Sequence, residues 1–131
     1  PDRRFVTAFV GVIDPATSTI AYQNAGHPPP LLRMPDGTVR ELLGRGAPLG
    51  LREDAKPGAY AHALPAGSLL VLYTDGLIES TRDILEGERR LHAALRDSIV
   101  GEVENPAKLL HDLILVDGSR DDVAILTIAI R

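Results

Sequence analysis

One apolar run constrains the fold of this chain most, because it leads directly into a carboxylate and a glycine. The run is Ser68–Thr74, and Asp75-Gly76 follows it. Apolar side chains at consecutive positions predict a strand buried on both faces. A carboxylate at the end of such a strand is costly unless a cation, a hydrogen-bond donor or solvent meets it. The fold therefore has to bring the end of a central strand to a polar site.

A second acidic pair precedes another apolar run. Asp121-Asp122 stands directly before Val123–Ile130, which predicts a strand. Two acidic strand ends in one small domain suggest hard-cation chemistry, since Mg²⁺ and Mn²⁺ prefer carboxylates and water. Each site also has a plainer interpretation, because Asp-Gly is a common turn dipeptide and Asp-Asp suits a solvated strand start or a loop at a helix end. Both interpretations stay open at this point.

The remaining pattern predicts several strands first, then two helices, then a final strand. The strands are expected over Phe5–Ile13, Ile20–Asn24, Leu31–Met34, Val39–Leu43 and Tyr60–Leu64, with residues 44–58 as an irregular loop. Phe5–Ile13 is apolar on both alternating faces and is expected to be covered on both sides.

Two helices are expected in the second half of the chain. Leu91, Ala94, Leu95 and Ile99 share one helical face, and Asn105-Pro106 is a cap with a first-turn proline for the following helix. This order of elements favours an α+β fold with antiparallel sheet and helices on an outer face. No strand–helix alternation or glycine-rich phosphate loop supports a doubly wound nucleotide-binding fold.

Composition excludes several classes of function. The chain has 131 residues, a net charge of −4 and no Lys/Arg cluster, which argues against a nucleic-acid-binding surface. It has no cysteine, so thiolate metal sites and disulfides are excluded. No apolar run approaches the roughly 18 residues of a membrane span. No membrane contact and a cytoplasmic location are expected.

Histidine chemistry is not favoured by the sequence. His27 lies in Asn24–Pro30, where a general base or a metal ligand competes with a residue that only fixes a proline-rich turn. The turn-fixing interpretation is favoured. His62, His92 and His111 are expected at the surface, and no histidine spacing typical of a metal site occurs.

Four motifs in order resemble one known family. They are Asn24–Leu32, Ala47–Gly50, Leu64–Glu79 and Asp121–Leu126. Together they resemble the bacterial SpoIIE/RsbU-type branch of the metal-dependent serine/threonine protein phosphatases (the PPM family). The resemblance implies a β-sandwich with flanking helices and two Mg²⁺ or Mn²⁺ ions at one end. There a metal-bridging water attacks the phosphorus of a phosphoserine or phosphothreonine, without a covalent enzyme intermediate.

The resemblance also implies roles for individual residues. Asp75 and Asp121 would be metal ligands and catalytic residues, with Asp122 in a supporting role beside the metal. Gly76 would allow close backbone approach to the site, and Glu79 would shape its rim.

The N-terminal acidic motifs of the family, of the Gly-Asp-x-x-Asp and Asp-x-x-Gly-His-Gly types, do not occur in this chain. Residues 1–131 are therefore expected to be the C-terminal portion of such a phosphatase domain, with the N-terminal part missing. Asp75 and Asp121 supply about half of the protein ligands that a binuclear site needs. The isolated chain is expected to be nearly inactive, with metal weakly held or absent.

The family context implies partners as well. The usual substrate is a phosphorylated anti-sigma-factor antagonist, and a sensor domain often precedes the phosphatase domain. The alternative is a pseudophosphatase, a non-catalytic module that binds a regulatory partner. An uncovered sheet edge or core face could also lead to a homodimer or to strand swapping.

Overall fold

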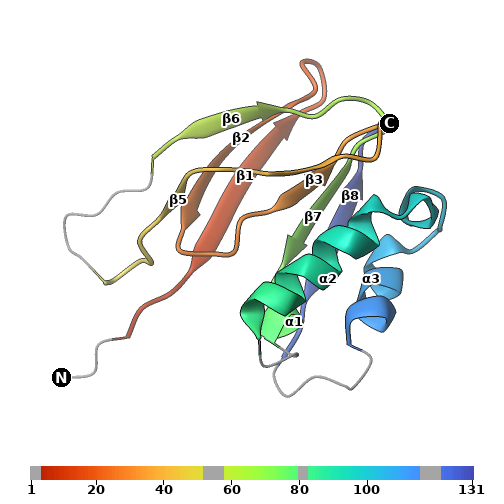
Figure 1. Ribbon diagram of the computed structural model, residues 1–131. Helices are drawn as coiled ribbons and strands as arrows, with labels where there is room; N and C mark the ends of the chain where they lie inside the picture. The colour runs from red at the N-terminus through yellow and green to blue at the C-terminus, as the bar shows by residue number, and fades with distance from the viewer. Residues whose placement is uncertain (1–3, 52–57, 80–82, 116–121) are drawn as a thin grey trace.

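The computed structural model describes residues 4–51, 58–79, 83–115 and 122–131. The strands are β1 (Ala8–Asp14), β2 (Thr19–Ala25), β3 (Leu31–Arg33), β4 (Val39–Glu41), β5 (Arg45–Gly46), β6 (Tyr60–Ala63), β7 (Leu69–Tyr73) and β8 (Ile125–Ala129). The helices are α1 (Asp75–Glu79), α2 (Ile84–Arg96), the 3₁₀ turn η1 (Ser98–Gly101) and α3 (Pro106–Ile114). Two sheets lie against each other, and α2 and α3 cover one of them (Figure 1).

The first sheet is built around β2. On one side β2 pairs antiparallel with β1, from Ala8 opposite Ala25 to Asp14 opposite Thr19. On its other side it pairs antiparallel with β6 and, at its last two residues, parallel with the short strand β5.

The second sheet has the order β4-β3-β7-β8 and is antiparallel throughout. Its strand β7 has neighbours on both sides, and four of its five residues are buried. This confirms the central strand expected from Ser68–Thr74.

Strand β7 contributes to two cores because its side chains alternate between the faces of the sheet. Leu70 lies between the two sheets with Ile20, Tyr22, Leu32, Leu42 and Leu64. Leu69, Val71 and Tyr73 pack on the other face, where the helices supply Leu91, Leu95, Leu110 and Ile114. The α+β sandwich with helices on an outer face is confirmed.

The helices begin where capping side chains stand. The Asp83 side chain accepts a hydrogen bond from the backbone N–H of Leu85, so α2 begins at Ile84, ahead of its apolar face. The Asn105 side chain caps α3 in the expected way, by accepting from the N–H of Lys108. None of the helices in the described part of the chain has the length and apolarity that a membrane crossing needs.

Two expectations for the first half of the chain were wrong in detail. Strand β1 begins at Ala8, and its outer face is open: Val10 is 64% and Val12 is 68% exposed. Nothing among the described residues packs over that face. The loop expected over 44–58 contains β5 and a backbone bridge between Val6 and Leu49, because these residues fold along the end of β2 and beside the N-terminal arm.

Candidate functional site

Asp75 lies where the central strand ends. It is the first residue of α1, directly after β7 and Thr74, and its side chain is exposed. The short helix starts as the N–H of Leu77 donates to the carbonyl of Thr74, 3.0 Å away. Solvent therefore reaches the carboxylate, which removes the desolvation cost of a buried charge.

Thr74 fastens the end of β7 to the residues before β8. Its backbone N–H donates to the Ala124 carbonyl over 3.1 Å, and its hydroxyl accepts from the Ala124 N–H over 2.9 Å. The bond to the Thr74 hydroxyl continues the hydrogen bonding between β7 and β8 by one residue beyond the end of β7. As a result the segment after the Asp-Asp pair is fixed beside Asp75.

Gly76 brings the two acidic segments into contact. It is buried, and a Cβ at this position would collide with the backbone carbonyl oxygen of Asp122. The backbone of Asp122 therefore lies close to Gly76, while the role of Gly76 at a metal site stays a prediction. Asp122 is exposed, whereas Asp121 lies outside the described residues. Glu79 is the exposed last residue of α1.

A second glycine positions α1. Gly87 is buried on α2, and a Cβ there would collide with the carbonyl oxygen of Ile78 on α1. The backbone of α1, the short helix that begins with Asp75, is therefore in direct contact with the backbone of α2 at Gly87.

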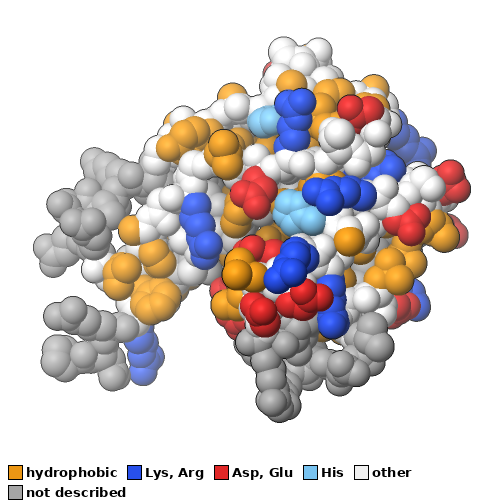
Figure 2. Space-filling model, viewed as in Figure 1, with side chains coloured by type: hydrophobic (Ala, Val, Ile, Leu, Met, Phe, Trp, Pro, Cys, Tyr) orange, Lys and Arg blue, Asp and Glu red, His pale blue; other side chains and the backbone are white. Residues whose placement is uncertain are grey.

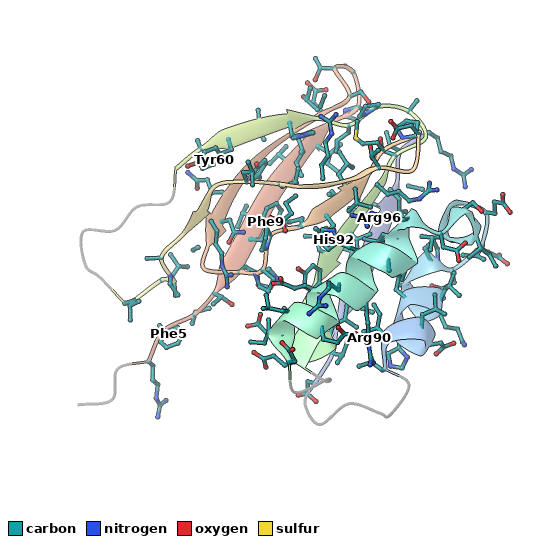
Figure 3. The ribbon with its side chains drawn as sticks, in the orientation of Figure 1. Phe5, Phe9, Tyr60, Arg90, His92 and Arg96 are labelled. Carbon is teal, nitrogen blue, oxygen red and sulfur yellow. The ribbon has the colours of Figure 1, made fainter. Side chains whose placement is uncertain are left out.

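Carboxylates from α1, α2 and β4 act on the phenol of Tyr73. Burial raises the pKa of the Tyr73 phenol, and the carboxylates of Glu88, Glu41 and Asp75 raise it further, while the Arg45 guanidinium opposes them. Glu41 Oε1 also lies 3.8 Å from His92 Nε2, on the side of α2 that faces the sheets (Figure 3). Figure 2 shows acidic side chains gathered over the start of α2, interleaved with basic ones.

These residues fit one side of a hard-cation site. Asp75 and Asp122 offer carboxylate oxygens, the donors that Mg²⁺ and Mn²⁺ prefer. The tight Gly76–Asp122 approach fixes the backbone beneath those two side chains. In the described ranges no group of three or more His, Cys, Asp or Glu side chains is placed to hold a metal ion.

Comparisons with known proteins identify several similar chains. The chain is 37% identical over 79 residues to the phosphoserine phosphatase RsbP of Bacillus subtilis, a match covering 60% of this chain and 20% of RsbP. The RsbU and RsbW domains of Rv1364c from Mycobacterium tuberculosis match with a TM-score of 0.76 and 30% identity, covering 92% of this chain and 35% of that one. The phosphatase domain of SpoIIE from Bacillus subtilis, presoaked with Mn, matches with a TM-score of 0.76 over 95% of this chain and 56% of that one. At 19% identity this last likeness shows the fold alone.

The family model described as Stage II sporulation protein E (SpoIIE) matches residues 1–131. The chain therefore belongs to this family, the SpoIIE/RsbU-type branch of the metal-dependent protein phosphatases. The family and the fold expected from the four motifs are both confirmed. The chain spans 20% of the length of the curated relatives it matches.

Sequence reasoning missed two residues that position the site. Thr74 was assigned only to the strand, although a hydroxyl directly before Asp-Gly is available to bond a neighbouring backbone. Gly87 received no role, although an isolated glycine within a helix often marks close packing. Both act on the backbone around Asp75.

Replacing Gly76 by alanine is expected to destabilise the protein by about 1–3 kcal/mol, because the new methyl group overlaps the Asp122 carbonyl. Urea unfolding measures this change. The matched control is Gly101→Ala, whose new methyl group would meet only the tip of the Arg33 side chain, 3.1 Å away, and should shift stability by less than about 0.5 kcal/mol. Equal stability of the two variants would show that the Gly76 contact does not constrain the fold.

Proposed function

We propose that residues 1–131 are part of a longer metal-dependent phosphatase domain that dephosphorylates phosphoserine or phosphothreonine in a regulatory protein. The observation that carries this proposal is the convergence of the Asp75 and Asp122 segments at Gly76, in a chain matched by the SpoIIE family over its whole length. The 56% coverage of the SpoIIE phosphatase domain supports a longer domain.

In this proposal Asp75 and Asp121 hold Mg²⁺ or Mn²⁺, and Asp122 supports them. Bound divalent ions lower the pKa of a water ligand and offset charge on phosphoryl oxygens. Asp75 is fixed at the start of α1, so its carboxylate is presented by a rigid helix–strand junction.

Asp75→Asn tests the proposal in the natural gene product that carries this chain. We expect Mn²⁺-dependent release of phosphate from a phosphoserine protein to fall by about 100-fold or more, because the amide is a poor ligand for a hard cation. The matched control is Asp14→Asn in the β1–β2 turn at the other end of the sheets, where the side chain only accepts from the Ala16 N–H. Asparagine keeps that acceptor, so activity should not change.

If the natural protein releases no phosphate from a phosphoserine protein in Mn²⁺, the enzyme assignment fails. The module would then be a pseudophosphatase that binds a regulatory partner. If Asp75→Asn keeps full activity while substitution of a different acidic residue abolishes it, the metal is held by other residues than Asp75.

The proposed substrate is a phosphorylated protein of the anti-sigma-factor-antagonist type. RsbP is a phosphoserine phosphatase, and the Mycobacterium tuberculosis structure joins RsbU and RsbW domains in one chain. We further propose an upstream sensor domain in the parent protein, a cytoplasmic location and no nucleic-acid partner. The net charge of −4 agrees with the last point.

The 131-residue chain by itself is expected to hydrolyse phosphoserine protein slowly or not at all in saturating Mn²⁺, because it lacks the N-terminal acidic motifs of the family. A phosphate-release assay on the purified chain measures this. Robust turnover that Asp75→Asn abolishes would contradict the expectation and show that these residues form a complete site.

We also propose that the isolated chain associates through the open face of the first sheet. Val10 and Val12 lie on that face, and Phe5 is 56% exposed on the N-terminal arm (Figure 3). Exposed apolar strands and unpaired edges favour pairing with another chain.

Sedimentation velocity over a concentration series is expected to show a monomer–dimer equilibrium for the isolated chain. Val12→Lys should shift it toward monomer, because a charge on the contacting face is costly to bury. Leu113→Lys, at a 45% exposed position on α3, serves as the control. A monomer at every concentration would rule the association out.

A further inference from the structure

Several contacts fix the backbone of the β2–β3 loop around His27. Asn24 is fully buried, and its side chain accepts from the His27 N–H over 2.8 Å and donates to the His27 carbonyl over 2.9 Å. Gly26 has a φ of 72°, and a Cβ there would lie 2.5 Å from Pro48 Cγ. Three prolines follow His27. All these restraints act on the backbone, so the imidazole is not needed to hold the loop.

The strand register places this loop at the Asp75 end of the second sheet. Leu31 of β3 pairs antiparallel with Val71 of β7, so the residues before Leu31 lie toward the carboxyl end of β7. Figure 1 shows the β2–β3 connection, α1 and the start of β8 at the same end of the two sheets.

Arg45 is hydrogen-bonded to this loop. Its Nη2 donates to the Gly26 carbonyl over 2.8 Å, and its side chain is exposed. The Tyr73 phenol is within electrostatic range of both Arg45 and Asp75. A cation is therefore anchored next to His27, at the end of the molecule that carries the acidic residues.

The ring of His27 has one nitrogen that the protein does not use. Nδ1 is buried and has no hydrogen-bond partner among the described residues, while the side chain as a whole is only half-buried. Burying an N–H without an acceptor is strongly disfavoured, so the neutral ring is best assigned its proton on Nε2. This assignment leaves Nε2 as a hydrogen-bond donor.

We propose that His27 and Arg45 form the phosphoryl-binding part of the site. His27 Nε2–H and the guanidinium of Arg45 donate hydrogen bonds to the phosphoryl oxygens of the phosphorylated residue. Arginine and histidine donors suit such a group because charge-assisted bonds to phosphate are strong. The proposal rests on the proposed phosphatase function and adds the recognition of the substrate's charged group.

The geometry of the side chains gives a matched pair of substitutions. Glutamine places an amide N–H near the position of Nε2, whereas the shorter asparagine reaches only as far as Nδ1. Neither change touches the Asn24 bonds, which involve only the backbone of residue 27. His27→Gln is therefore expected to keep part of the function that His27→Asn loses.

The experiment measures inhibition by inorganic phosphate, KM for a phosphoserine protein and Tm, in the natural gene product. His27→Asn and Arg45→Gln are each expected to raise KM and the phosphate inhibition constant by about 10-fold or more. Arg45→Lys keeps the charge and should lose less. His62→Asn is the control, because the His62 ring bonds the Ala63 carbonyl on β6, away from this loop.

Unchanged KM and phosphate inhibition in His27→Asn and Arg45→Gln would overturn the proposal, whatever happens to Tm. A lower Tm with no change in phosphate binding would identify His27 as a residue that only fixes the turn. If His27→Asn does not fold, Arg45→Gln decides the matter, since Arg45 is exposed. Failure of the phosphatase function itself would be seen separately, as the absence of Mn²⁺-dependent phosphate release by the unsubstituted protein.

Discussion

The junction between the end of β7 and the start of β8 is the contact on which the rest of the site depends. Thr74 and Ala124 exchange backbone and side-chain hydrogen bonds there, and Gly76 lies against the Asp122 carbonyl. Adjacent antiparallel strands place the end of one beside the start of the next. Two acidic segments that are far apart in the sequence therefore come together at one end of the molecule.

This junction is rigid because β7 is buried on both faces. Leu70 packs between the sheets, while Val71 and Tyr73 pack under the helices. The same helical layer reaches α1, since Gly87 of α2 contacts the Ile78 carbonyl. Movement of the Asp75 backbone would thus disturb both cores, so packing fixes the position of this five-residue helix.

The sequence predicted the elements better than their limits. The continuous apolar run placed β7, and the Asn105-Pro106 cap placed the start of α3, nearly where they are, because burial and capping act locally there. The start of α2 was not predicted, because the apolar residues of its first turn, Ile84 and Leu85, are exposed and do not belong to the core face of the helix. Strand β5 was missed because its two-residue parallel pairing joins residues 21 positions apart, Asn24 with Arg45 and Ala25 with Gly46. The open face of Val10 and Val12 could not be foreseen either, because apolar alternation does not say what covers a strand.

The sequence by itself determined the family, the sandwich with its helical layer, and the candidate metal ligand Asp75, because motif order and hydrophobic periodicity are properties of the chain alone. Only the tertiary structure decided three contacts: Gly76 lies against the Asp122 carbonyl, Gly87 packs against α1, and Arg45 bonds the Gly26 carbonyl beside His27. The physical reason is that each of these contacts joins segments brought together by strand register and packing. Residue type alone does not encode such proximity.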